Sequence, residues 1–190
     1  RTPGLKVALP STAADAKGLL ATAIRSEDPV LFLEHKALYR AASARTPTPP
    51  EDYTLPFGKA RIAREGSDMT IVTYGMMTQK SLNVAEELEQ EGVDVEVVDL
   101  RTIVPLDSET ILESVRKTNR ALVVYEDHEF IGFGAELSAQ IADDAFTYLD
   151  APIRRVAGEF TPIPFAHSLE RSVLPSDEGI LEAARDLAAF

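Results

Sequence analysis

The sequence predicts an α/β protein built on a mostly parallel sheet that helices cover. Residues 69–74 form an apolar run rich in β-branched side chains, which stops at Gly75 as a buried strand would. Residues 81–88 have the apolar spacing of a helix that ends at Gly92, and residues 93–100 form a second apolar run. A strand, a helix and a strand in this order predict a right-handed crossover between parallel strands.

The same alternation of strand and helix continues to the end of the chain, which predicts one α/β domain over residues 55–190. Residues 59–64 alternate apolar and charged side chains, as an edge strand does. Residues 101–107 are expected to turn the chain directly into a helix. The remaining predicted elements are that helix, capped by Asp107-Ser108 and running to about Lys117, a strand at 121–125, a helix from Ala135 to about Asp143, a strand at 153–156, and a final helix from Ser176 to Phe190.

The first forty residues predict a separate β-α-β unit. Strands are expected at residues 5–9 and 30–33, and the helix between them runs to about Arg25 after a capped entry near Ser11 and Asp15. Two strands and one helix are too few to form a sheet that helices cover. We therefore interpret residues 1–40 as the C-terminal remnant of another domain. Residues 41–54 are rich in proline and predict an extended interdomain linker.

Composition narrows the classes of function. The formal net charge of −12 argues against nucleic acid and anionic membrane as partners, although an acidic surface also serves solubility. The absence of cysteine excludes disulfides, a thiolate nucleophile and cysteine-bound metal. No apolar run approaches the roughly 20 residues of a membrane span, and residues 1–4 lack the features of a signal peptide. We therefore expect a cytoplasmic protein.

Two stretches near the third strand of the 55–190 domain are candidate sites. Gly132-Phe133-Gly134 lies before a helix and could bind phosphate, but without a third glycine or a following Lys-Ser/Thr it is more typical of a tight turn. His128 follows Glu126 and Asp127 at the carboxyl end of the strand. Its imidazole could act as a general base or could be a solvated loop histidine.

Three other residues are weaker candidates for a functional role. Arg101, just beyond a strand, could bind an anion, but we favour a structural role in which it tethers the loop through carbonyl oxygens. His35 and His167 stand alone, so no histidine pairing predicts a transition-metal site. The chain has no Gly-x-Ser-x-Gly motif, which argues against a serine hydrolase.

Several motifs, taken together in their order and spacing, resemble the β subunit of the E1 component of 2-oxo acid dehydrogenase complexes. Residues 3–30 are similar to the end of its pyrimidine-binding domain, through Pro3-Gly4-Leu5-Lys6-Val7, Pro10-Ser11-Thr12, Asp15-Ala16-Lys17-Gly18-Leu19-Leu20, Ala23-Ile24-Arg25 and Asp28-Pro29-Val30. Later residues resemble its transketolase-type C-terminal domain, through Gly58-Lys59-Ala60, the run from Asp99 to Asp107, Gly132-Phe133-Gly134-Ala135-Glu136 and the run from Asp150 to Val156. The expected fold is a transketolase C-terminal-like α/β domain preceded by a β-α-β remnant of a thiamine-diphosphate-binding domain.

The resemblance implies a thiamine-diphosphate enzyme that decarboxylates pyruvate or a branched-chain 2-oxo acid and acylates the lipoyl group of E2. The stretch Glu34–Arg40 leans slightly towards the branched-chain or broad-range type. The family's catalytic glutamate and histidine lie upstream of this sequence, and the diphosphate and Mg²⁺ ligands belong to the α subunit. No catalytic or cofactor-binding residue is therefore assigned here, and the chain alone is expected to be inactive.

Two roles implied by the resemblance do fall on this chain. A structural K⁺ ion is expected at Ala23, Ile24, Ser26 and Asp28, where the alternative is an ordinary helix end. The acidic surface and Phe190 are expected to serve assembly. The implied partners are the E1 α subunit or region, a second β chain across a two-fold axis, and the subunit-binding and lipoyl domains of E2. The alternative is that Phe190 packs on its own helix.

Two other classes of function remain open. One is a stand-alone transketolase C-terminal-like binding module without catalysis, which would be expected to begin near residue 50. The other is a nucleotide-binding regulatory domain, for which Gly132-Phe133-Gly134 gives little support.

Overall fold

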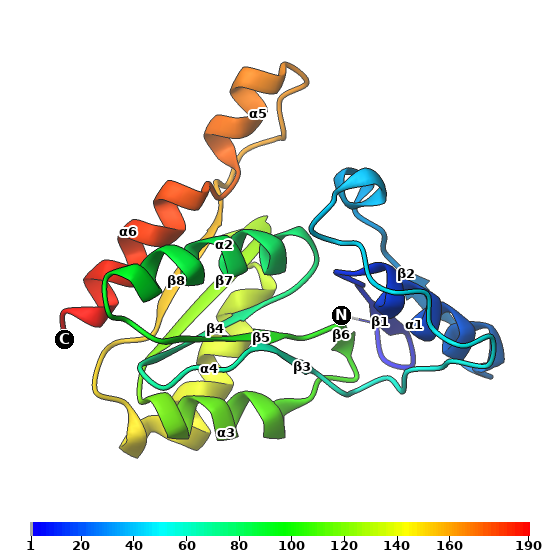
Figure 1. The fold of residues 1–190 in the computed structure, drawn as a ribbon, viewed down its shortest axis with the longest axis horizontal. Helices are drawn as coiled ribbons and strands as arrows, with labels where there is room; N and C mark the ends of the chain where they lie inside the picture. The colour runs from blue at the N-terminus through cyan, green and yellow to red at the C-terminus, as the bar shows by residue number, and fades with distance from the viewer. Residues whose placement is uncertain (1) are drawn as a thin grey trace.

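A computed structural model describes residues 2–190; residue 1, the first of the predicted segment 1–40, lies outside the described residues. The chain forms two units that lie side by side, one around a five-stranded sheet and the other around a three-stranded sheet (Figure 1). We call the part before residue 41 the first unit and the part after residue 54 the second unit.

The five-stranded sheet has the strand order β3-β5-β4-β7-β8. Strand β4 pairs in parallel with β5 and β7, β7 pairs in parallel with β8, and β3 pairs antiparallel with β5 at the edge. The α/β class with a mostly parallel sheet and the predicted edge strand are therefore confirmed. The bounds are β3 Arg61–Arg64, β4 Met69–Thr73, β5 Val95–Asp99, β7 Ala121–His128 and β8 Arg154–Gly158.

Helices cover both faces of this sheet, as parallel strands require. On one face α2 and α6 pack on side chains such as Ile71 and Val97, and on the other α3 and α4 pack on side chains such as Val72 and Val98. Successive side chains of β4 pack alternately into the two cores, because neighbouring residues of a strand point to opposite faces of the sheet. The helices are α2 Met76–Gln90, α3 Ser108–Thr118, α4 Phe133–Ala145 and α6 Asp177–Ala188.

The three-stranded sheet has the order β2-β1-β6 and combines both units. Strands β1 (Lys6–Ala8) and β2 (Val30–Phe32) are parallel and joined by α1 (Ala13–Arg25), which confirms the predicted β-α-β unit. Strand β6 (Thr102–Val104) belongs to the second unit by sequence and pairs antiparallel with β1. The expectation that residues 101–107 turn directly into a helix was therefore wrong, because three of them complete this sheet first.

Some predicted boundaries differ from those observed. Helix α2 begins at Met76 instead of near residue 81, and β7 runs on to His128 instead of ending at residue 125. Thr12, not Ser11, is the N-cap of α1, and its hydroxyl accepts a hydrogen bond from the Asp15 N–H. Elements absent from the sequence prediction are α5 (His167–Val173) and the 3-10 helices η1 (Lys36–Arg40) and η2 (Phe146–Tyr148).

Residues 41–54 form neither helix nor strand. This stretch lies along α1, where the Lys17 ammonium donates hydrogen bonds to the carbonyls of Pro49 and Pro50, at 2.9 and 2.6 Å. Gly18 lets this stretch lie close to the helix, since a Cβ there would lie 2.8 Å from the Tyr53 ring. The linker is thus attached to the surface of the first unit.

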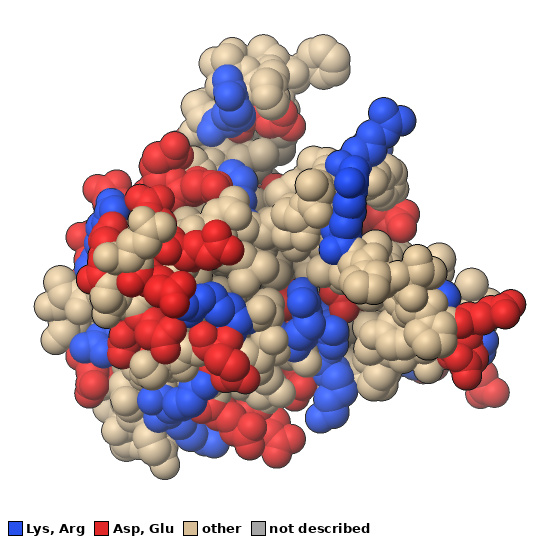
Figure 2. Space-filling model, viewed as in Figure 1, with Lys and Arg blue, Asp and Glu red and all other residues tan. Residues whose placement is uncertain are grey.

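Charge is unevenly spread over the visible face. Acidic side chains gather over α2 and α6, whereas the side formed by the first unit shows more uncharged surface (Figure 2). Within residues 2–190, no helix is long and apolar enough to cross a membrane.

Candidate functional site

Buried charges lie where the two units meet. Asp15 of α1 and Asp99 at the end of β5 are almost fully buried, at 1% and 0% exposed. The Arg101 guanidinium contacts the Asp15 carboxylate at 2.8 Å, and the Arg61 guanidinium contacts Asp99 at 2.9 Å and Asp15 at 3.7 Å. The Ser11 hydroxyl donates a hydrogen bond to Asp99. We call these five residues the junction cluster.

The junction cluster joins three segments that are distant in sequence, which contain Ser11 and Asp15, Arg61, and Asp99 and Arg101. Burial raises the pKa of the Asp99 carboxyl, and the hydrogen bond from Ser11 and the charge of Arg61 act against that rise. Two arginines facing two carboxylates leave no net charge for a ligand. The cluster is therefore built to hold the units together and offers no empty anion site.

Arg101 has the structural role that the sequence favoured, but through different contacts. Its backbone has a φ of 58°, and its carbonyl accepts a hydrogen bond from the Leu9 N–H at 2.8 Å. The guanidinium does not tether its own loop through carbonyls; it pairs with the carboxylate of Asp15 in the other unit. The expected tether is thus corrected to a contact between the units.

A second contact between the units lies at the carboxyl ends of β4 and β7. The His35 Nε2 atom lies 3.2 Å and 3.1 Å from the two carboxylate oxygens of Glu126. The hydrogen bond with Glu126 raises the pKa of His35, while burial acts in the opposite direction. His35, which stands alone in the sequence, is therefore paired with an acidic residue from the second unit.

This contact closes one side of a small crevice. Its volume is about 120 Å³, and its lining comes from Leu9, Pro10, Leu33, Glu34, His35, Tyr74, Gly75 and Glu126. Burial raises the pKa of the Tyr74 phenol, so this group stays neutral at physiological pH. Carboxylates at the lining make the crevice unsuitable for an anionic ligand.

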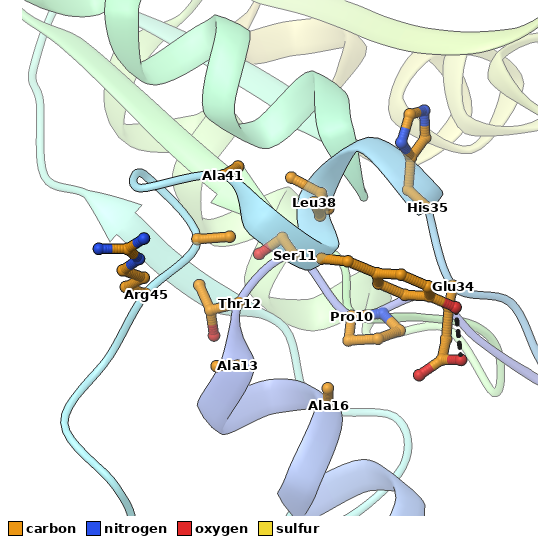
Figure 3. Close-up of a pocket in the computed structure, with 12 residues that line it drawn as sticks. Pro10, Ser11, Thr12, Ala13, Ala16, Glu34, His35, Leu38, Ala41 and Arg45 are labelled. Atoms are coloured by element: carbon orange, nitrogen blue, oxygen red, sulfur yellow. Dashed lines mark hydrogen bonds between the residues drawn. The ribbon is translucent and has the colours of Figure 1, made fainter.

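A larger hollow of about 290 Å³ lies between the first unit and the beginning of the linker. Figure 3 shows Leu38 and Ala41 on one side of it and Ala13 and Ala16 of α1 on the other. The Tyr39 hydroxyl donates a hydrogen bond to Glu34 at 3.1 Å. Small and apolar side chains dominate the lining, so this hollow suits an apolar group.

The phosphate-binding interpretation of Gly132-Phe133-Gly134 gains nothing from the structure. A Cβ on Gly134 would lie 2.0 Å from the Tyr125 ring, and one on Gly132 would lie 1.9 Å from the His128 carbonyl. Both glycines are explained by the close approach of α4 to β7. His128 itself contacts the Thr161 carbonyl through Nε2 at 3.1 Å and the edge of the Phe160 ring.

The four residues of the predicted K⁺ site lie at the end of α1 and the turn after it. The Lys6 ammonium contacts the Ser26 hydroxyl at 3.1 Å and the Asp28 carboxylate at 2.9 Å. The Ala23 carbonyl accepts the Ser26 N–H. These oxygens suit a positive charge, but an ammonium already takes the two side chains, so the K⁺ site stays a prediction.

Phe190 lies at the C-terminal end, past α6, and is 60% exposed. The predicted cap of that helix is confirmed, because the Ser176 hydroxyl accepts the Gly179 N–H at 3.0 Å. Within residues 2–190, no group of three or more histidine or acidic side chains is placed to hold a metal.

The sequence and this architecture match known families. The model of the transketolase C-terminal domain matches residues 58–180, which is more than half of the chain. The chain belongs to the transketolase C-terminal domain family. The model of the transketolase pyrimidine-binding domain matches residues 1–42. The strand order and the flanking helices described above are thus those of a transketolase-type domain.

Relatives of this transketolase-family chain include E1 β subunits. It is 50% identical over 188 residues to the pyruvate dehydrogenase E1 component subunit beta of Bacillus subtilis, covering 99% of this chain and 57% of that protein. It is 48% identical over 190 residues to the same subunit from Staphylococcus aureus, covering 100% of this chain and 58% of that protein. The chain therefore spans less than two thirds of the length of these relatives.

The fold also matches a solved structure. A protein described as a split gene transketolase, inactive beta4 tetramer, aligns with a TM-score of 0.78 and 25% identity, over 98% of this chain and 58% of that one. The expected transketolase-like fold is confirmed. The resemblance to an E1 β subunit is confirmed at the level of the domains and of these relatives.

Proposed function

We propose that this chain is part of the β subunit of a thiamine-diphosphate-dependent E1, which decarboxylates a 2-oxo acid and acylates the lipoyl group of E2. The observation that carries the proposal is the identity of about half of all residues to pyruvate dehydrogenase E1 β subunits over almost the whole chain. Pyruvate is the first candidate substrate for that reason, and a branched-chain 2-oxo acid is the second.

The residues of this chain do not fit thiamine diphosphate by themselves. The crevice between the units holds about 120 Å³ and is lined by Glu34 and Glu126, whose carboxylates would repel a diphosphate. The arginines of the junction cluster are already paired with carboxylates. We therefore assign the cofactor and Mg²⁺ to the rest of the enzyme, and this portion to assembly and E2 docking.

Activity measurements separate the two candidate substrates and test the role of the chain. The chain alone should show no thiamine-diphosphate-dependent decarboxylation, because it offers no cofactor site. The complete β subunit assembled with its α subunit should decarboxylate pyruvate with a higher kcat/KM than a branched-chain 2-oxo acid. Decarboxylation by the isolated chain would contradict the assignment, and a higher kcat/KM for the branched-chain acid would replace pyruvate as substrate.

The proposed partners are the E1 α subunit, a second β chain and the subunit-binding and lipoyl domains of E2. Acidic side chains over α2 and α6 suit a basic partner domain, and Phe190 at the end of α6 is exposed next to them. Phe190→Ala should weaken binding to the E2 subunit-binding domain in a calorimetric titration. Phe146→Ala, at another exposed phenylalanine (72%), is the matched control and should not weaken it.

The K⁺ site at Ala23, Ile24, Ser26 and Asp28 is proposed as a stabilising feature only. If it binds, the Tm of the chain should be higher in KCl than in NaCl of equal ionic strength, and Asp28→Ala should remove the difference. Equal Tm values in both salts for the unaltered chain would favour the ordinary helix end, in which the Lys6 ammonium alone supplies the positive charge.

A stand-alone binding module is the second candidate function. The acidic crevice and the neutralised junction cluster favour it, because neither offers a site for the cofactor. Under this alternative the chain would bind partner subunits, yet no combination with an α subunit would decarboxylate a 2-oxo acid. We further propose the division into residues 1–40, 41–54 and 55–190, and a cytoplasmic location.

A further inference from the structure

Two lines of contact between the first unit and the second unit include ion pairs. The first line runs along β1, where β6 pairs with β1 and the Arg101 guanidinium pairs with the buried Asp15. Backbone hydrogen bonds and buried ion pairs hold this line, and the arginines in it do not titrate at ordinary pH.

The second line runs along the stretch after β2, residues 33–41, which includes η1. His35 at its start contacts Glu126 near the end of β7. Among residues 2–190, no other ion pair joins this stretch to the second unit. The side chains are about one third exposed, at 33% for His35 and 28% for Glu126, so solvent protons reach the pair.

The His35–Glu126 contact lies at a functionally important place in this class of fold. In the five-stranded sheet, the chain leaves β4 towards β5 on one side, and β7 lies on the other. The crevice beside Tyr74, Gly75 and Glu126 is at the carboxyl ends of β4 and β7, where the strand order reverses. Open α/β sheets bind their ligands at such a point.

We propose that His35 and Glu126 form a pH-sensitive latch, which holds residues 33–41 over the crevice at acidic pH and releases them above neutral pH. The crevice is then narrow when the histidine is protonated and open when it is neutral. The latch is independent of the catalytic reaction proposed above, since it needs neither cofactor nor partner subunit.

The acidic charges around His35 favour its protonated form. Glu126 faces it from β7, the charge of Glu170 acts from α5, and the neutral phenol of Tyr74 lines the same crevice from the end of β4. On its own stretch, Glu34 and Lys36 are adjacent in sequence and opposite in charge. Acidic groups therefore outnumber basic groups around His35.

The direction of the pH effect follows from these charges. The hydrogen bond and charge of Glu126 raise the pKa of His35 above 6.5 despite burial. A group whose pKa is raised on folding contributes its full stabilisation below the unfolded pKa and loses it as pH rises through the folded pKa. The latch should therefore be closed below pH 6.5 and should open above the pKa of folded His35.

Histidine NMR tests the pairing directly, because the chain has only three histidines and their ring signals can be assigned by substitution. In the unaltered chain, His35 should titrate above 6.5. Glu126→Gln should lower the pKa of His35, because the partner charge is lost while burial remains. Glu129→Gln, which removes a nearby exposed charge that pairs with Arg155, is the matched control and should leave that pKa in place.

The movement is tested with two spin labels, for which a chain without cysteine is well suited. Labels at Arg40→Cys and Glu86→Cys lie on exposed positions at the end of η1 and on α2. The distance distribution between them should be narrow at about pH 5.5 and broader at about pH 8.5. In the His35→Gln and Glu126→Gln variants the distribution should be broad at both pH values.

Three results would overturn the latch. One is a pKa of His35 at or below 6.5 in the unaltered chain. Another is a label distribution that does not change with pH. The third is a pH-dependent change that persists in His35→Gln, which would place the titrating group elsewhere. His35→Gln and Glu126→Gln remove opposite members of the same pair. If one variant fails to fold, the other still tests the proposal.

Discussion

Single side chains at the junction of the units determine how much the contact between them contributes to stability. A carboxylate as enclosed as that of Asp15 would not remain charged without a partner, because its transfer from water costs several kcal/mol. Arg101 supplies the partner charge at 2.8 Å and is itself only 15% exposed. Loss of Arg101 would therefore leave the buried Asp15 carboxylate without its nearest positive charge.

Substitution of Arg101 tests this dependence. Arg101→Met keeps most of the side-chain volume but leaves Asp15 with only the more distant Arg61, so the free energy of unfolding should fall by about 3 kcal/mol. Urea unfolding at neutral pH measures the loss. Arg185→Met removes an arginine that pairs with Glu91 on the surface and should cause a much smaller change. Similar losses in the two variants would show that the buried pair contributes little.

Gly134 is a second residue whose identity is set by contact. Gly134→Ala would drive a methyl group into the Tyr125 ring and should cost about 1–3 kcal/mol of stability through overpacking. Gly179→Ala is the matched substitution in another helix, where the nearest atom is the Ser176 hydroxyl at 3.4 Å, and it should stabilise the chain by about 0.5–1 kcal/mol. Thermal unfolding of both variants shows whether each substitution raises or lowers stability. No loss of stability in Gly134→Ala would contradict the packing explanation.

Among the elements, α3 has the cap with the most contacts. The Asp107 carboxylate accepts hydrogen bonds from the Thr110 N–H and hydroxyl, and from the Ala60 N–H at 2.9 Å. Burial alone would raise the pKa of Asp107, but these hydrogen bonds outweigh it and lower the pKa below 3.8. One side chain thus starts a helix and also fixes the stretch that leads into β3.

Asp107→Ala should therefore cost more than the loss of a simple cap. We expect a decrease of about 2 kcal/mol, against about 1 kcal/mol for Ser176→Ala, whose hydroxyl accepts one N–H at α6. Because the pKa is lowered on folding, the contribution of Asp107 is present above 3.8 and is lost as pH falls through the folded pKa. The difference in unfolding free energy between the unaltered chain and Asp107→Ala should shrink in strong acid, and a constant difference would exclude the charged cap.

The long elements of this chain could be predicted from sequence because their signals are local. The apolar run of β4 and the Ser176 cap of α6 each identify one element without knowledge of the rest. Strand β6 could not be found in this way, because Thr102–Val104 is three residues long and becomes a strand only by pairing with β1. Helix α5 is seven residues long and follows a proline-rich loop, so its periodic signal is weak.

The candidate site was harder to predict for the same reason. The place of Arg101 after a strand makes it a candidate, but its partner Asp15 lies far earlier in the sequence and its only local signal is that of a helix start. His35 and Glu126 are far apart in the sequence, and no periodicity or motif relates them. Contacts between units require the tertiary structure, which single-sequence patterns do not contain.

At the scale of the whole molecule, the second unit is complete in a way that the first is not. The five-stranded sheet has helices on both faces and two apolar cores of its own. The three-stranded sheet has α1 from its own unit and takes its third strand from the other. Apolar side chains of the first unit such as Ile24 remain exposed, at 77%. Stability is thus concentrated after residue 54.

Division of the chain tests this asymmetry and the proposed boundaries. Residues 55–190 alone should unfold in one cooperative transition, because both cores are retained. Residues 1–54 alone should lack cooperative structure, since β1 loses its partner β6 and Asp15 loses both arginines. Circular dichroism during thermal unfolding distinguishes the two fragments. A cooperative transition in residues 1–54 would show that the first unit is an independent domain.

The pairing of β1 with β6 also bears on how the chain is made. Ala8 is translated well before its neighbour Thr102. At typical rates of about 5–20 residues per second, β1 waits on the order of 5–20 s for that neighbour. During this interval the nascent stretch around β1 has an unfilled strand edge that a chaperone or another growing copy can occupy. Strand β1 is therefore made well before the strand with which it pairs, and the yield of folded protein should depend on the speed of translation.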